Sequence, residues 1–265
     1  MTKITIGQYY PTNSRIHKLD PRVKLCGTII YIVLLLVANH YMGYIVAAIF
    51  LAACVKFSKV PPKMIFRGLR AVLFIMVFIA LTNLFLTTGG ETVFQLGFVR
   101  VTNTGIVLAA KMCARLVLLI CGSSFLTLTT SPIQLADGIE FMLRPLKKVK
   151  VPAHDIAMMM SIALRFIPTL AEEADKIIKA QKARGADFDT GGPAKRAKSL
   201  LPILVPLFVS AFKRADELAT AMEARCYRGD VNRTRMKEMK MKKLDWLAAL
   251  VLALYCALVL ATRIL

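Results

Sequence analysis

Two arginines occupy matching places in an internal repeat, and they are the residues of this sequence best suited to recognising another molecule. Segments 174–184 and 215–225 coincide at five positions when shifted by 41 residues, and they end at Arg184 and Arg225. A guanidinium at an exposed helix end can form a forked, hydrogen-bonded pair with a carboxylate. The matching pairs are Ala174 and Ala215, Asp175 and Asp216, Ala180 and Ala221, Ala183 and Ala224, and Arg184 and Arg225.

Small residues flank both arginines, which lets each helix end enter a groove. A basic residue in the last turn of a helix is favoured by the helix dipole, and this explains one such arginine well. It does not explain two with the same flanking alanines, because repetition indicates two copies of one device. We therefore expect two similar acceptor grooves, as a dimer of related partners would offer. The predicted docking residues are Ala183, Arg184, Gly185, Ala224, Arg225 and Cys226.

The apolar parts of the same two helices are rich in methionine. A flexible thioether surface adapts to irregular or changing partners, so these residues form a candidate contact face. Packing between the two helices is the simpler explanation, and it must hold for part of the set. The residues are Met158, Met159, Met160 and Phe212.

Lys111 and Arg115 lie inside a long apolar run, four residues apart and therefore on one helix face. Charges within a membrane segment are costly and usually face protein or water. One interpretation is contact with a partner or a polar interior. The other is that Lys111 extends to the outer surface while Arg115 packs against backbone carbonyls. Both interpretations stay open.

Other reactive residue types do not form sites. The six cysteines include no Cys-x-x-Cys pair and the three histidines are far apart, so we expect no metal site. A group of four carboxylates could indicate a membrane enzyme. However, the adjacent Glu172 and Glu173 point to different sides of a helix, and no histidine or cysteine joins the group. A solvated helix face is the better interpretation. The cluster comprises Asp155, Glu172, Glu173 and Asp175.

The composition indicates an integral membrane protein. Of 265 residues 57% are hydrophobic, the mean hydropathy is +0.59, and the apolar residues gather in blocks long enough to cross a bilayer. The formal charge of +20 could suggest nucleic acid. In so apolar a chain it instead indicates basic cytoplasmic loops beside anionic lipid, and we expect no nucleic-acid partner.

Charge placement decides how the first apolar run crosses the membrane. The run from Leu25 to Val55 is either one over-long helix or a hairpin turning at Asn39-His40. Basic clusters flank both ends of the run, and only a hairpin places both clusters in the cytoplasm. Further crossings are expected at 71–86, with a start near Phe66 as the alternative, at 105–130 and at 244–265, with a short strand or interfacial piece at 93–101.

The fold class that follows is an all-α integral membrane protein. About five transmembrane helices accompany a cytoplasmic module of about three coupling helices, with the N-terminus in the cytoplasm and the C-terminus outside. The module helices are expected at 131–150, 153–185 and 193–227. The predicted regions are 1–130 for the lead-in and four crossings, 131–243 for the module, and 244–265 for the last crossing.

In this topology the Ala-Arg-Gly and Ala-Arg-Cys triplets resemble the paired X-Arg-X motifs of the T component of energy-coupling factor transporters. Segments 129–132 and 14–24 are also similar to that family, so the resemblance covers essentially the whole chain. Cys226 departs from a second glycine, but the family accepts small residues there.

The resemblance implies a scaffold that links two ATP-binding-cassette ATPases to a small membrane S component. ATP hydrolysis by the ATPases would move the coupling helices, so that the S component delivers a vitamin or metal ion into a prokaryotic cell. Arg184 and Arg225 would each enter one ATPase, and the apolar helix faces would hold the S component.

The residues themselves agree with a non-catalytic subunit. No Gly-x-x-x-x-Gly-Lys-Ser/Thr loop occurs, so ATP and Mg would be bound by the partner ATPases and this chain would carry no cofactor. The alternative is a self-sufficient secondary transporter or channel. It would need a polar path, for which Lys111 and Arg115 are the candidates, and inverted repeats that five crossings do not supply.

Overall fold

A computed structural model of the chain describes residues 9–38, 40–87, 92–96, 99–143, 145, 148, 152–186, 188, 192, 198–229 and 241–264. Eight helices and one β-hairpin make up these residues, which confirms the predicted all-α class with a small β addition. The chain divides into two compact units. The membrane unit comprises Gly7–Met142 and Glu238–Leu265, and the helix-pair unit comprises Leu143–Lys237 with Met1–Ile6.

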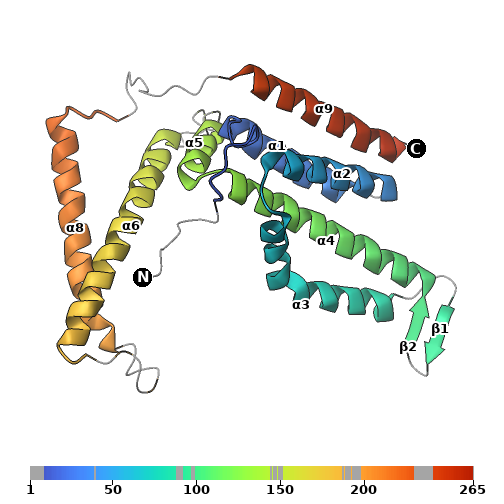
Figure 1. The fold of residues 1–265 in the computed structure, drawn as a ribbon, viewed down its shortest axis with the longest axis horizontal. Helices are drawn as coiled ribbons and strands as arrows, with labels where there is room; N and C mark the ends of the chain where they lie inside the picture. The colour runs from blue at the N-terminus through green and yellow to red at the C-terminus, as the bar shows by residue number, and fades with distance from the viewer. Residues whose placement is uncertain are drawn as a thin grey trace. The chain divides into compact units, whose positions relative to one another are not determined.

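The membrane unit begins with the predicted helical hairpin. Helix α1 spans Pro21–Val37 and α2 spans Tyr41–Ser58, so the hairpin interpretation of the first apolar run is confirmed (Figure 1). Asp20 caps α1 by accepting a hydrogen bond from the Arg22 N–H, and Pro21 opens the first turn. His40 precedes α2, while Asn39 lies outside the described residues.

Helices α3 (Pro62–Leu86) and α4 (Asn103–Thr129) form a second antiparallel pair. Helix α3 begins earlier than either expected start, at residue 71 or near Phe66, because Pro62 already occupies the first turn of the helix. A β-carbon on Gly68 would lie 2.9 Å from the Ser124 hydroxyl, so α3 and α4 approach each other closely here. Strands β1 (Thr92–Leu96) and β2 (Val99–Thr102) pair antiparallel in the connection from α3 to α4, where a short strand or interfacial piece was expected over 93–101.

Helix α9 (Lys243–Ile264) closes the membrane unit against α1 and α2. A stack of rings marks this core, with the Phe50 and Tyr255 centroids 4.5 Å apart and Tyr31 beside both. Tyr31 also faces α4, where a β-carbon on Gly122 would lie 2.5 Å from its ring. The core residues buried here are Tyr31, Leu35, Ala38, Tyr44, Ala47, Tyr255 and Val259.

Four described helices, α2, α3, α4 and α9, are long and apolar enough to cross a membrane. Helix α1, the first predicted crossing, has 17 residues and spans about 26 Å at 1.5 Å per residue, so it is the shortest of the five helices predicted to cross. Many large apolar side chains on these helices are exposed, as lipid-facing residues would be. The chain is a multi-pass membrane protein.

The first turn of α1 contacts both the start of α9 and helix α5. The Asp245 carboxylate, 2% exposed, accepts hydrogen bonds from the Asp20 and Lys242 backbone N–H groups at 2.7 Å each. On the other side, the Arg22 guanidinium lies 4.0 Å from the centroid of the Phe141 ring on α5. A β-carbon on Gly138 of α5 would lie 3.5 Å from the Pro21 carbonyl oxygen, so α5 packs directly on this turn.

Helix α5 spans Pro132–Leu143 and is shorter than predicted. The helix was expected over 131–150, and residues 144, 146, 147, 149 and 150 of that range lie outside the described part of the chain.

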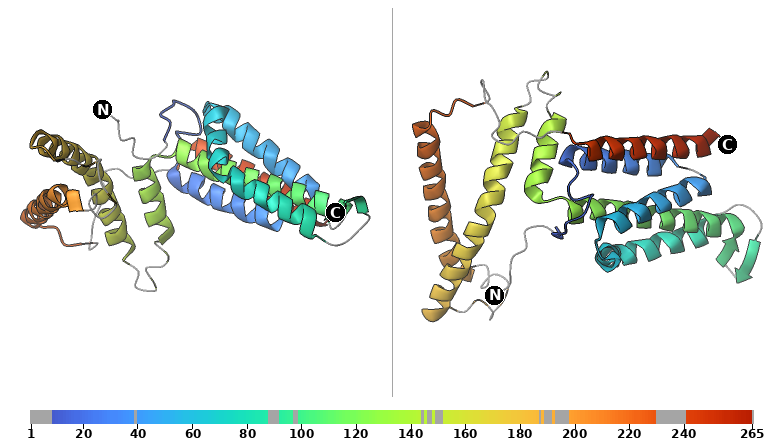
Figure 2. Two further views of the ribbon diagram at one scale, coloured as in Figure 1. Left: turned by 90° about the horizontal axis from the view of Figure 1, so that it is seen from below. Right: turned by 45° about the horizontal axis from the view of Figure 1, so that its top comes forward.

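The helix-pair unit contains α6 (Ala153–Ala183) and α8 (Leu201–Ala224). Helix α6 ends at Ala183, two residues before the predicted end, and α8 begins at Leu201, with Pro202 in its first turn, where a start near residue 193 was expected. Residues 193–197 lie outside the described part of the chain. The two helices run antiparallel and lie close together where α6 ends and α8 begins (Figure 2), where the Gln181 amide donates to the Pro202 carbonyl at 3.4 Å.

Candidate docking site at two matched helix ends

The end of α6 is closed by backbone hydrogen bonds around a glycine in the left-handed conformation. The Arg184 N–H donates to the Ala180 and Gln181 carbonyls, at 3.2 and 3.1 Å. Gly185 has a φ of 86°, and the Ala186 N–H then reaches back to the Gln181 carbonyl at 2.9 Å. This arrangement satisfies the last carbonyls and stops the helix directly after Arg184.

The end of α8 repeats this geometry 41 residues later. The Tyr227 N–H donates to the Met222 carbonyl at 3.1 Å, as Ala186 does to Gln181. Cys226 has a φ of 55°, and it is one of two non-glycine residues with positive φ in the described chain. Arg184 and Arg225 therefore hold the same backbone position, with φ of −84° and −92°. The sequence repeat is also a structural repeat.

All six predicted docking residues are exposed. Within the described residues neither the Arg184 nor the Arg225 guanidinium has a hydrogen-bonding or ionic partner. Because α6 and α8 are antiparallel, the two arginines lie at opposite ends of the pair (Figure 1). Each end presents a forked cation beside small side chains, which is suited to a carboxylate in a groove of a partner.

A polar clasp holds α6 to α8, and sequence reasoning missed it. The Glu173 carboxylate accepts hydrogen bonds from the Ser210 hydroxyl at 2.5 Å and from the Arg214 guanidinium at 3.0 Å. The Ser210 hydroxyl, with help from Arg214, holds the pKa of Glu173 below its ordinary value of 4.5. Glu173 and Arg214 are themselves 41 residues apart, so opposite charges at matching positions of the repeat were the available signal.

The other carboxylates of the considered enzyme cluster do not join this clasp. Glu172 and Asp175 are exposed on α6, and Asp155 lies in its first turn. Glu173 is occupied by the contact between the helices. The clasp is therefore a structural feature of the helix pair.

The predicted apolar contact residues fall into two groups. Phe212 is 69% exposed and stacks on Phe208 of the same helix, and Met159 on α6 is 57% exposed. Met158 and Met160 are half-buried, as the packing interpretation expects. Other large apolar side chains extend the bare face of α8. They are Leu201, Leu204, Val205, Phe208 and Val209.

Lys111 and Arg115 lie in the membrane unit, on α4. The Arg115 guanidinium donates to the Tyr44 hydroxyl at 2.7 Å and to the Ala38 carbonyl at 2.9 Å, at the end of α1. The Lys111 ammonium lies 4.5 Å from the centroid of the Tyr41 ring. Arg115 thus makes the carbonyl contact that the packing interpretation expects, and a path built on it would have to break these bonds.

The whole-chain pattern of helices and matched ends has counterparts among known proteins. The family model described as cobalt transport protein, CbiQ, matches residues 12–237. The chain belongs to the CbiQ family. This match includes both Ala-Arg-small triplets and four of the five predicted crossings.

Relatives in this family are similar over nearly their whole length. The energy-coupling factor transporter transmembrane protein EcfT of Ruminiclostridium cellulolyticum is 54% identical over 242 residues, covering 91% of this chain and 90% of the relative. EcfT of Clostridium kluyveri is 54% identical over 258 residues, covering 97% and 94%. EcfT of Bacillus subtilis is 46% identical over 239 residues, covering 90% of each. The resemblance to T components, expected from the triplets, is confirmed.

Proposed function

We propose that this chain is the scaffold and energy-coupling subunit of an ATP-driven uptake transporter. It joins two ATPases to a membrane S component that captures a vitamin or a metal ion. The observation that carries the proposal is the pair of matched helix ends, each presenting an exposed arginine with no partner among the described residues. Similarity to transmembrane proteins of energy-coupling factor transporters supports it.

Each helix end docks in a groove of one ATPase subunit. Two matching ends require two matching grooves, which a pair of related ATPases supplies, and a groove carboxylate would pair with the guanidinium. ATP and Mg are bound by those partners, since this chain lacks a phosphate-binding loop of the Walker type. Hydrolysis there moves α6 and α8, and the helix pair transmits the motion.

The bare apolar face of the helix pair holds the S component. Phe212 is exposed on α8 and Met159 is exposed on α6, and exposed apolar side chains in patches mark interaction surfaces. The flexible side chain of Met159 can adapt to a partner that changes position. In this arrangement the basic helix-pair unit and the N-terminus lie in the cytoplasm and the C-terminus lies outside, in the cell membrane of a prokaryote.

The test is co-purification of the tagged chain with its candidate ATPases, followed by an uptake assay. We expect Arg184→Ala and Arg225→Ala each to weaken binding and coupled uptake, and the double variant to abolish uptake. Losing one partner of a desolvated ion pair costs about 3–5 kcal/mol. Arg→Lys at either position should rescue poorly, because an ammonium cannot make the forked contact.

Two nearby cations provide matched controls. Lys179→Ala and Arg228→Ala remove exposed positive charge close to the two helix ends without touching either triplet. Both should bind ATPase as the wild type does. Normal uptake by the Arg184→Ala/Arg225→Ala variant, or no ATPase bound to the wild type, would show that the helix ends are not the dock.

A further inference from the structure

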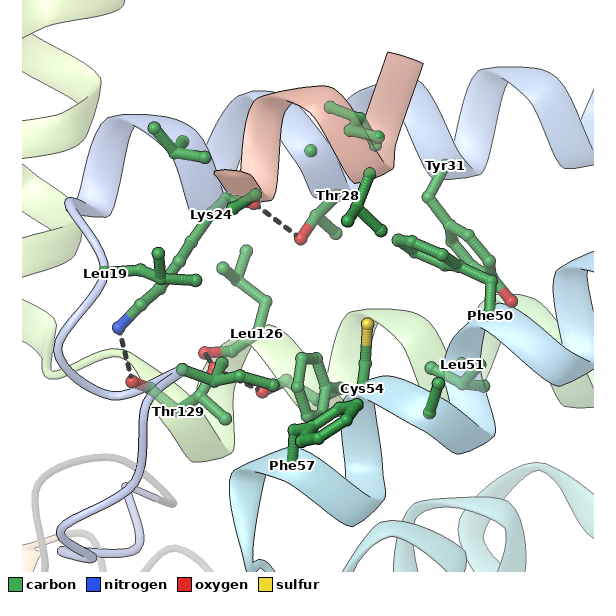
Figure 3. A pocket seen from close by; sticks show the side chains of 18 of the residues that line it. Leu19, Lys24, Thr28, Tyr31, Phe50, Leu51, Cys54, Phe57, Leu126 and Thr129 are labelled. Carbon is green, nitrogen blue, oxygen red and sulfur yellow. Dashed lines mark hydrogen bonds between the residues drawn. The ribbon is translucent and has the colours of Figure 1, made fainter. Parts of the chain in front are cut away.

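A largely apolar cavity of about 320 Å³ lies inside the membrane unit (Figure 3). Helices α1, α2, α4 and α9 and the lead-in before α1 contribute its walls. Its volume is at the lower end of the range of roughly 300–1,000 Å³ found for ligand pockets. Neither the predicted docking residues nor Lys111 and Arg115 line it.

The apolar part of the cavity opens toward the lipid-facing surface. Phe57 of α2 and Leu247 of α9 line it and are 60% and 63% exposed. Further in, Phe50, Leu51 and Tyr31 form the wall seen on the right of Figure 3. A hydrocarbon chain can therefore enter from the bilayer and lie against apolar side chains without uncovering backbone polar groups.

The opposite end of the cavity is polar and positively charged. The Lys24 ammonium donates to the His17 carbonyl at 3.1 Å and to the Thr129 carbonyl at 3.0 Å. The nearby carboxylates of Asp20 and Asp245 offset its charge. Burial, with the Lys24 charge beside it, lowers the pKa of His17 below 6.5, so the imidazole adds no positive charge at neutral pH.

Arg15 is the cation at this end whose charge is not offset. It lines the cavity, it is exposed, and it has no hydrogen bond or ion pair to any residue that the structure describes. An accessible guanidinium is suited to a phosphodiester, which accepts its forked N–H groups. The cavity thus joins a hydrocarbon-binding body to one free anion-binding group.

We propose that this cavity binds one anionic phospholipid, with an acyl chain in the apolar body and the phosphate on Arg15. A cavity that opens among membrane-spanning helices is supplied from the bilayer, and its charge selects anionic over zwitterionic headgroups. The proposal uses only residues of the membrane unit. Its test is therefore independent of the test of the proposed ATPase docking.

Native mass spectrometry of the purified full chain tests this. Delipidated protein is titrated with phosphatidylglycerol and phosphatidylcholine that carry the same acyl chains. We expect one phosphatidylglycerol retained per chain, preferred roughly five-fold over phosphatidylcholine, which corresponds to about 1 kcal/mol for one cation near an anionic headgroup. Inorganic phosphate should not displace it, because the acyl chain supplies most of the binding.

Matched variants separate the headgroup from the chain. Arg15→Gln should abolish the preference for phosphatidylglycerol and Arg15→Lys should keep it, while Lys18→Gln removes a neighbouring exposed cation outside the cavity and should change nothing. Ala248→Phe fills the cavity and should remove both lipids, whereas Ala249→Phe changes the adjacent exposed residue and should not.

A second cavity-filling variant guards against misfolding. Gly27→Leu should reproduce the loss seen with Ala248→Phe, and the Trp246 fluorescence of both should show cooperative unfolding. Retention of phosphatidylglycerol by both filling variants, or an unchanged preference in Arg15→Gln, would overturn the proposal. Failure of the wild type to retain a lipid would overturn it as well.

Discussion

Cys226 adopts a left-handed backbone conformation, which a β-carbon disfavours. Gly185, at the matching position of α6, adopts a left-handed conformation too, and it has no β-carbon. The triplet pattern predicted that each helix ends after its arginine. It did not predict that Cys226 would adopt a positive φ as Gly185 does, because a non-glycine residue favours a negative φ. The hydrogen bond from Tyr227 back to Met222 imposes it.

We expect Cys226→Gly to stabilise the end of α8 by about 1 kcal/mol, because it removes the steric cost of a β-carbon at positive φ. By hydrogen exchange, the Tyr227 amide should then exchange several-fold more slowly. Gly185→Ala is the reverse experiment and should speed exchange at Ala186. If neither substitution changes exchange, the two caps do not hold the helix ends as the structure shows.

At the scale of the element, pairs of helices meet through a few contacts that composition does not disclose. The hairpin at His40 could be predicted from basic residues at both ends of an apolar run. The clasp at Glu173 could not, since periodicity shows which face of a helix is apolar but not which polar residues oppose each other across two helices. Close contacts at glycines, such as Gly122 with Tyr31, are hidden for the same reason.

Acidification should loosen α6 from α8. The pKa of Glu173 is lowered in the folded chain, so its contribution is present above about pH 4.5, the ordinary value, and is lost as the pH falls through the folded value. The distribution of distances between spin labels on the two helices should broaden at low pH. Glu173→Gln should remove this pH dependence, whereas Glu172→Gln, on the exposed neighbour, should leave it unchanged.

Gly122→Ala should destabilise the contact of α1 with α4 by about 1–3 kcal/mol, because the added methyl group overlaps the Tyr31 ring. Thermal unfolding followed by Trp246 fluorescence measures the loss. Gly27→Ala is the matched control, since its β-carbon would meet only the Leu252 side chain at 3.8 Å and alanine favours helix. Equal stability of the two variants would contradict the close packing at Gly122.

At the scale of the molecule, the sequence predicted a membrane part interrupted by a basic helical module. Hydropathy and charge suffice for this because both act over whole segments. Local interactions set the boundaries of individual helices, so α3 begins earlier than its predicted crossing, with Pro62 in the first turn, and α8 begins at Leu201, with Pro202 in its first turn. Lys24 belongs to the basic cluster that precedes the first apolar run, yet it is buried, and its acceptors are the carbonyls of His17, seven residues before it, and of Thr129, distant in sequence.

Asp245→Asn should destabilise the membrane unit by about 1–3 kcal/mol, because the amide can replace only one of two buried carboxylate acceptors. Trp246, the single tryptophan, lies beside it and reports the change through its fluorescence on heating. Asp216→Asn, on the exposed surface of α8, should leave the transition where it is. An unchanged midpoint for Asp245→Asn would show that these hydrogen bonds contribute little.

The contacts of the first turn of α1 also have a mechanical consequence. The helix-pair unit is an insertion, so the chain leaves the membrane unit after α5 and returns to it at α9. Helix α5 rests on the first turn of α1 through Phe141 and Gly138, and α9 is tied to the same turn through Asp245. The two elements that flank the insertion, α5 and α9, therefore contact the same turn of α1. A force transmitted through either of them would act on this turn, which carries Lys24 in the wall of the cavity.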